Sequence, residues 1–120
     1  MRIFKNTRFA RFADKEGITD DELRQAAGLL DAGRFAADLG GGVYKIRVAR
    51  TGGGKSGGYR VIVIFRSGER TFYVEGFAKS TRDNISRKEK KKFKELAGDY
   101  LWLSETIVDG MLRTRMLVEI

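Results

Sequence analysis

Residues 59–77 read YRVIVIFRSGERTFYVEGF, and this stretch decides the fold class. Residues 59–65 are strongly β-forming and apolar on both faces apart from Arg60, as expected of a central strand. Ser67 and Gly68 predict a tight turn into a hairpin partner over 71–77. The stretch therefore predicts two adjacent antiparallel strands at the centre of a sheet.

A third strand is predicted just upstream, where residues 43–50 read VYKIRVAR. Alternation there places Tyr44, Ile46 and Val48 on one side and Lys45 and Arg47 on the other. Short glycine-containing links join the three strands, so the centre of the chain is expected to be an antiparallel meander.

The flanking segments predict helices. Asn6, Thr19, Ser86 and Ser104 are suitable N-caps, and Thr19 and Ser86 each begin a capping-box pattern. Short strands are possible at 2–4 and 117–120. The expected architecture is α+β over a single domain, 1–120, with N-terminal helices, a three- to five-stranded antiparallel sheet and a C-terminal helix.

Composition excludes several classes of function. The chain has 120 residues, with no cysteine and no histidine. Disulfides, thiolate nucleophiles, Cys/His zinc sites and imidazole catalysis are therefore excluded, and no metal or cofactor is expected. No apolar run approaches the roughly 20 residues that span a bilayer, and no signal peptide is visible. We expect a cytoplasmic protein that does not bind membranes.

The positive charge is concentrated in one part of the chain. The net charge is +8, but residues 45–94 hold 15 of the 24 basic side chains and only four acids, a net of +11. The remainder carries nine basic and twelve acidic side chains, a net of −3. This asymmetry indicates a face that binds a polyanion.

The glycine-rich segment 52–58, GGGKSGG, superficially resembles a phosphate-binding loop. The nucleotide-binding pattern would need glycine at position 49, which is Ala49, and would need a following helix. A strand follows instead, so we reject a P-loop NTPase. Two interpretations remain: a hairpin loop, or a loop whose glycines let the backbone approach an RNA phosphate with Lys55 as the arm.

Cations cluster on the predicted sheet face. If the strand over 43–49 pairs with that over 58–66, Arg60 lies near Arg47 or Lys45. Three cations on one face repel each other unless an anion lies between them; the alternative is an ordinary solvated face. Lys79 and Arg82 follow the third strand, where a strand end meets a helix N-terminus.

Further basic and aromatic residues border this cluster. We expect RNA or ribosome contacts from the following set: Arg50, Tyr59, Arg87, Lys88, Lys90, Lys91, Lys92 and Lys94. Candidates for stacking on bases are Tyr44, Tyr59 and Phe77. The aromatics expected in the core are Phe9, Phe12, Phe35, Phe65, Phe72, Phe93 and Trp102.

These motifs together resemble RelE-type toxins of bacterial toxin–antitoxin modules, and most closely the HigB-like branch. The resemblance rests on YKIRV at 44–48, GYR at 58–60, GFAK at 76–79 and DNI at 83–85. It implies a small microbial-ribonuclease-like fold and ribosome-dependent cleavage of mRNA in the decoding site. It also implies a cognate antitoxin, which is itself expected to bind DNA.

The resemblance also implies catalysis by lysine and arginine, which suits a chain without histidine. By resemblance, the catalytic candidates are Lys45, Arg47, Arg60, Lys79 and Arg82, and Lys55 of the glycine-rich segment is added as a further candidate. Arg60 is assigned to the transition-state phosphate, Lys45 or Lys55 to the general base, and Lys79 or Arg82 to the leaving group. Several RelE-type toxins carry a tyrosine after this segment, where this chain has Ser86 and Arg87.

Three alternatives remain at this point. A non-catalytic RNA- or DNA-binding module would bind naked RNA in a salt-sensitive way and release no cyclic phosphate. A ParE-like gyrase poison would not need the Lys45, Arg47 and Arg60 cluster. A toxin that has lost activity is the third, and fold similarity alone does not choose among them.

Overall fold

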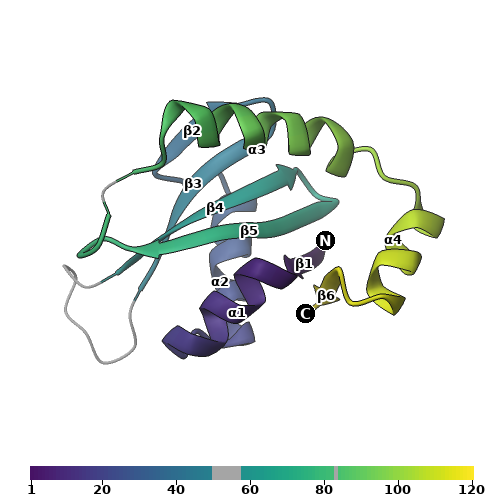
Figure 1. Ribbon diagram of the computed structural model, residues 1–120, viewed down its shortest axis with the longest axis horizontal. Coiled ribbons are helices and arrows are strands. Elements are labelled where there is room, and N and C mark those ends of the chain that lie inside the picture. The colour runs from purple at the N-terminus through teal and green to yellow at the C-terminus, as the bar shows by residue number, and fades with distance from the viewer. Residues whose placement is uncertain (50–57, 83) are drawn as a thin grey trace.

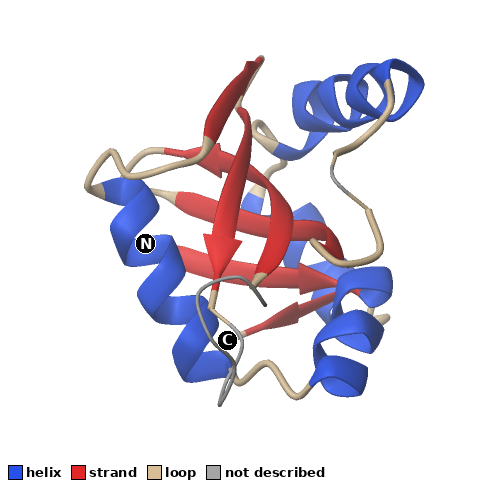
Figure 2. Cartoon of the chain, turned by 90° about the vertical axis from the view of Figure 1, so that its left-hand side faces the viewer, coloured by secondary structure: helices blue, strands red, loops and turns tan. Residues whose placement is uncertain are grey.

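The computed structural model describes residues 1–49, 58–82 and 84–120, which form one mixed sheet with helices on both faces (Figures 1 and 2). Arg50, Lys55 and most of the glycine-rich segment therefore lie outside the described residues. The strands are β1 (Arg2–Asn6), β2 (Ala37–Gly40), β3 (Val43–Val48), β4 (Tyr59–Arg66), β5 (Arg70–Ala78) and β6 (Leu117–Glu119). Their order across the sheet is β2-β3-β4-β5-β1-β6.

The predicted meander is confirmed. Strands β3, β4 and β5 pair antiparallel in sequence order, and the turn between β4 and β5 contains Gly68 at φ 72°. Only glycine adopts such a backbone conformation without strain. Ladder hydrogen bonds join these three consecutive strands, and the candidate site is built on them.

All four predicted helix caps are also confirmed. The helices are α1 (Thr7–Glu16), α2 (Asp20–Asp31), α3 (Arg87–Tyr100) and α4 (Glu105–Arg113). The side chains of Asn6, Thr19, Ser86 and Ser104 each accept a hydrogen bond from a backbone N–H in the first turn of the following helix. Both predicted capping boxes are formed, Thr19 with Glu22 and Ser86 with Glu89.

The sheet separates two hydrophobic clusters. Helices α1 and α2 cover one face, where Phe9, Leu23 and Leu30 pack against Ile46, Val61 and Tyr73. On the other face, α3 and α4 supply Phe93 and Val108, which pack against Phe4, Ile62, Ile64 and Phe72. Figure 1 shows α3 running along one face of the sheet with α1 and α2 on the other. Burial on both faces explains why β4 is apolar on both sides.

The sheet is larger than predicted and is not wholly antiparallel. The described residues form six strands of it, and β1 pairs parallel with β5, with Arg2 opposite Arg70 and Lys5 opposite Tyr73. Strand β2 escaped prediction because it has only four residues, ADLG, without a β-branched side chain. Two aromatics expected in the core are exposed instead, Phe35 to 46% and Trp102 to 68%.

Candidate active site

The register of the meander assembles the predicted cations on one face of the sheet. Across β3, β4 and β5, one row consists of Lys45, Ile62 and Glu75, and the next consists of Arg47, Arg60 and Phe77. Residues directly opposite one another on neighbouring strands point to the same face. Ile62 belongs to the cluster beneath α3, so both rows lie on the α3 face of the sheet.

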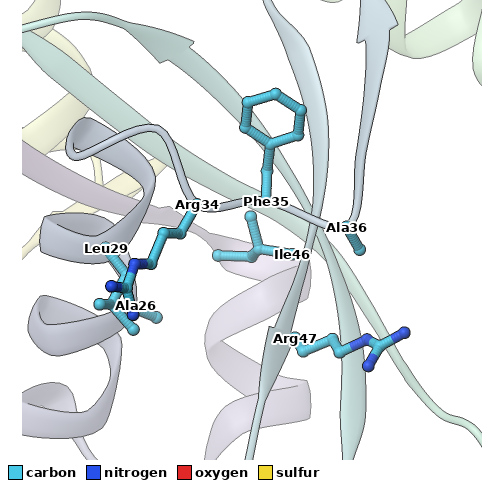
Figure 3. A pocket seen from close by; sticks show the side chains of 7 residues that line it. All are labelled: Ala26, Leu29, Arg34, Phe35, Ala36, Ile46 and Arg47. Carbon is cyan, nitrogen blue, oxygen red and sulfur yellow. The ribbon is translucent and has the colours of Figure 1, made fainter.

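Arg47 points away from α2. In Figure 3, Ile46 is directed toward Ala26 and Leu29 of α2, whereas Arg47 extends from the opposite side of β3. This is the ordinary alternation of a strand, and it separates an apolar face from a cationic one. The expectation that Lys45 and Arg47 share a face is confirmed by their places in the two rows.

The central cations have no acidic partner among the described residues. Within residues 1–49, 58–82 and 84–120, no ion pair involves Lys45, Arg47, Arg60 or Lys79. The ion pairs that are present there mostly join another arginine to a carboxylate. Arg47 and Arg60 are direct cross-strand partners, an arrangement that costs stability when both charges are alike. A bound anion would remove this cost.

A surface hollow of about 460 Å³ lies at this end of the sheet. Arg47, Arg60 and Lys79 line it together with Gly58, whose carbonyl accepts a hydrogen bond of 3.4 Å from the Lys79 amide. Residues of α2, among them Glu22, line its other side. The three cations outnumber this one carboxylate, and cations that border one hollow can contact a phosphate from several sides.

Arg82 is placed differently from the other cations because it is already paired. Its guanidinium donates to the Glu89 carboxylate and, through Nε at 2.9 Å, to the backbone carbonyl of Asn84. It also lies 4.9 Å from the centroid of the Phe77 ring. The hydrogen bond that Arg82 donates to Glu89 raises the pKa of the Arg82 side chain further above its usual range. Arg82 is therefore a poor proton donor, which argues against its expected role at the leaving group.

Asn84 and Glu89 are two site residues to which the sequence analysis assigned no role in catalysis or RNA contact, although Asn84 belongs to the DNI motif at 83–85. The Asn84 side-chain oxygen accepts a hydrogen bond of 3.4 Å from the Lys45 ammonium group. Glu89 was predicted only as half of a capping box, and its pairing with Arg82 carries no local sequence signal. The connection between β5 and α3 brings both residues to the cation cluster, beside the ends of β3 and β4 (Figure 1).

Several residues expected to contact RNA lie elsewhere. Tyr59 is 2% exposed and belongs to the cluster on the α1 and α2 face, so its expected role in RNA contact is corrected. Its ring meets Phe12 edge-on, because residue 59 is one position out of phase with Arg60. Tyr44 lies on that same face, and Phe77 is buried beneath Arg82.

The basic residues of α3 extend away from the cluster. Lys88, Lys91, Lys92 and Lys94 are exposed and Lys90 is half-buried, as is expected of side chains that surround an amphipathic helix. Lys94 lies beside Gly40, the last residue of β2 before the turn into β3, and so at the opposite end of β3 from Val48. Arg87 is exposed at the start of α3. These residues widen the basic surface without entering the two rows.

The residues present restrict the chemistry that the site can perform. Among the described residues no group of three or more carboxylates could hold a metal ion. Glu75 pairs with Arg8 at 3.2 Å and Glu89 pairs with Arg82, while Glu22 of α2 lines the hollow with the cations. Lysine and arginine side chains thus predominate among the groups that could move protons and stabilise charge.

Comparison with known proteins agrees with this geometry. A family model described as the RelE toxin of the RelE/RelB toxin–antitoxin system matches residues 1–120. The chain belongs to the RelE toxin family. A search of the curated proteins finds no match.

Membership of the RelE family makes the chain a toxin of a toxin–antitoxin system and implies an antitoxin partner. The match covers every element of the fold, including the two rows of the α3 face. None of the helices that the structure describes is both long and apolar enough to cross a membrane.

Proposed function

We propose that this RelE-family toxin is a ribosome-dependent mRNA endonuclease that acts in the decoding site. The observation that carries the proposal is the Arg47–Arg60 cross-strand pair, which lies beside Lys45 without a carboxylate partner among the described residues. A sheet that retains such a costly pair has a use for two guanidinium groups, and a phosphodiester is the anion that RNA supplies.

The proposed reaction is an internal transfer at phosphorus. The 2′-oxygen attacks the adjacent phosphate, the bond from phosphorus to the 5′-oxygen breaks, and a 2′,3′-cyclic phosphate and a 5′-hydroxyl result. The proton leaves the 2′-hydroxyl for the base, and another proton reaches the 5′-oxygen from the acid. No metal ion or cofactor takes part in this scheme.

Each role falls to a residue of the α3 face. Arg60, with Arg47 opposite it, is assigned to the non-bridging oxygens, where negative charge grows in the transition state. Lys45 is the base, because it lies in the row next to Arg47 and Arg60 on the same face of the sheet. Lys79 is the acid, because it lines the same hollow as Arg60 while Arg82 is engaged by Glu89. Lys55, the alternative base, lies outside the described residues.

The ribosome is the proposed source of substrate geometry. The exposed basic residues Arg87, Lys88 and Lys91 of α3 would bind ribosomal RNA through phosphate contacts. The described hollow is open, so it does not by itself force RNA into the in-line geometry that the reaction needs. Contacts outside the chain would supply that alignment.

The test is cleavage of a labelled message on purified, programmed ribosomes, with product ends mapped by primer extension. We expect cuts inside the translated frame, a 2′,3′-cyclic phosphate, and loss of about 100-fold or more in rate for Arg60→Ala. The matched control is Arg113→Ala, which removes the same charge from α4 at the opposite end of the molecule (Figure 1). Growth arrest with intact messages would contradict the proposal and redirect attention to gyrase.

A further inference from the structure

Four residues form a continuous chain of contacts from α3 to the β3 lysine. Glu89 accepts from the Arg82 guanidinium, Arg82 Nε donates to the Asn84 carbonyl at 2.9 Å, and the Asn84 side-chain oxygen accepts from Lys45 Nζ at 3.4 Å. The structure assigns to Asn84 the role of a positioning residue for Lys45, with Arg82 and Glu89 fixing Asn84 in turn. This inference rests on the proposed function of Lys45 as the base.

The end of the chain at α3 is well anchored. The Glu89 carboxylate also accepts from the Ser86 amide at 2.9 Å, while the Ser86 hydroxyl accepts from the Glu89 amide at 3.1 Å. This capping box ties Glu89 to the first turn of α3, and α3 is held on the sheet by Phe93 and Ala97. Glu89 therefore provides Arg82 with a fixed carboxylate rather than a mobile one.

Arg82 is held from a second direction by the sheet. Its guanidinium lies over the ring of Phe77, which is buried and directly opposite Arg60 in the register. A guanidinium on an aromatic face and in an ion pair loses most of its freedom. The backbone carbonyl of Asn84, which receives the Arg82 Nε hydrogen, is fixed as a consequence.

The side chain of Asn84 is oriented locally as well. Its oxygen accepts from the Ile85 amide at 2.9 Å, so the amide plane is set before Lys45 is considered. Lys45 otherwise has a flexible four-carbon stem and no ion-pair partner among residues 1–49, 58–82 and 84–120. Among the described residues, the Asn84 side-chain oxygen is the acceptor that the Lys45 ammonium group contacts, and its fixed orientation restricts where that group lies.

This arrangement separates two kinds of cation in one cluster. Arg47, Arg60 and Lys79 remain available to the phosphate, whereas Arg82 is used internally to hold the segment that leads into α3. Loss of Arg82 should then reduce catalysis indirectly, through Lys45. Other charged groups share this face with Lys45, and their titration contributes to any pH profile of cleavage. They are Arg47, Arg60, Glu75, Lys79, Arg82 and Glu89.

A double-mutant cycle on programmed ribosomes tests the inference. Asn84→Ala is expected to lower kcat about tenfold with little change in KM, since Arg47 and Arg60 still bind the phosphate. In a Lys45→Ala background the same substitution should have no further effect. Full additivity of the two losses would overturn the positioning role, as would an Asn84→Ala loss confined to KM.

The conservative variant Asn84→Asp supplies a readout that a purely structural role would not move. It keeps the acceptor oxygen but adds a carboxylate, which favours the charged form of a neighbouring amine. The acid limb of the kcat profile should therefore shift to higher pH, with activity regained at alkaline pH. Asn84→Asp with the profile of the wild type would overturn the inference.

A measurement independent of cleavage separates this inference from the proposed function. NMR relaxation of the Lys45 side-chain methylene next to Nζ reports its order directly. We expect that order to fall in Asn84→Ala and in Glu89→Gln, but not in the control Glu95→Gln on the exposed side of α3. If the wild type cleaves no message, the proposed function fails. Separately, if the order of the Lys45 methylene is unchanged in Asn84→Ala and in Glu89→Gln, the positioning role is overturned.

Discussion

Arg47 of β3 and Arg60 of β4 are direct cross-strand partners, and among the described residues neither has a carboxylate partner. Elsewhere on the same strand, Arg66 is also opposite an arginine, Arg70, but there Glu69 pairs with Arg66 and Glu105 pairs with Arg70. At Arg66 and Arg70, each arginine of the opposed pair thus has a carboxylate partner that offsets the repulsion between like charges. The described residues offer no such partner to Arg47 or Arg60.

Stability and activity should therefore change in opposite directions at Arg60. Replacing Arg60 with threonine removes the like-charge pair and introduces a β-branched residue, so the free energy of unfolding should rise by about 0.5 kcal/mol. Cleavage on programmed ribosomes should fall by about 100-fold or more. Urea unfolding and the cleavage assay measure the two effects on one preparation.

The matched substitution is Arg66→Thr on the same strand. It removes an arginine that pairs with Glu69 and lies 4.4 Å from the Trp102 ring centroid, so stability should fall slightly and cleavage should persist. A destabilised Arg60→Thr would refute the argument that the Arg47–Arg60 pair is kept for binding rather than for folding.

The Arg82–Glu89 pair predicts a defined pH dependence of stability. The hydrogen bond from Arg82 lowers the pKa of Glu89 to about 2, from a usual value of 4.5. Between pH 2 and pH 4.5 the Glu89 carboxyl is protonated in the unfolded chain but ionised in the folded protein. Its contribution to the free energy of unfolding is therefore complete above about pH 4.5 and is lost as the pH falls toward 2. Both side chains are about one-third exposed, and solvent screening keeps the contribution to about 1 kcal/mol or less.

Comparison of wild type with Glu89→Gln by urea unfolding over pH 2–7 measures this contribution. The wild type should be the more stable protein near neutral pH, and the difference should shrink as the pH approaches 2. A difference that stays constant over the whole range would contradict the assignment of the ion pair.

A side chain larger than that of Gly76 should disturb the packing on the opposite face of β5. A Cβ at this position would lie 2.6 Å from Cδ2 of Phe12, so the ring of α1 must move. Gly76→Ala should lower the free energy of unfolding by about 1–3 kcal/mol, measured by urea or thermal unfolding.

The control for Gly76→Ala is Gly98→Ala, since Gly98 lies inside α3 with nothing within 4 Å of an added Cβ. Alanine is the better helix former, so this variant should be more stable by about 0.5–1 kcal/mol. Equal responses at the two glycines would show that the approach of Phe12 to β5 is not tight.

The buried hydroxyl of Tyr73 links the sheet to α2. It donates a hydrogen bond of 2.5 Å to the carbonyl of Leu23, and burial raises the pKa of Tyr73 well above its usual value of 10. Tyr73→Phe should lower the free energy of unfolding by about 1 kcal/mol. Tyr100→Phe is the control, because its half-buried hydroxyl donates to no partner among the described residues, and it should change stability little.

The sequence by itself determined the elements and their faces. Caps at Asn6, Thr19, Ser86 and Ser104 set the helix starts, and the alternation of residues 43–50 with the apolar run at 59–65 predicted a meander with a cationic side. These signals are local, because a cap or an alternation is complete within a few residues. The RelE resemblance carried by the same residues agrees with the family match over the whole chain.

Only the tertiary structure decided which cations are available. Arg82 and Arg60 look alike in the sequence, but the connection from β5 to α3 pairs Arg82 with Glu89 while the register leaves Arg60 opposite Arg47. Likewise, Tyr59 is buried because it follows the phase of β4, whereas Trp102 lies in the turn between α3 and α4 and is exposed, so aromatic character alone decided neither. Register and long-range packing depend on residues far apart in the chain, and these contacts choose the partner of each charge.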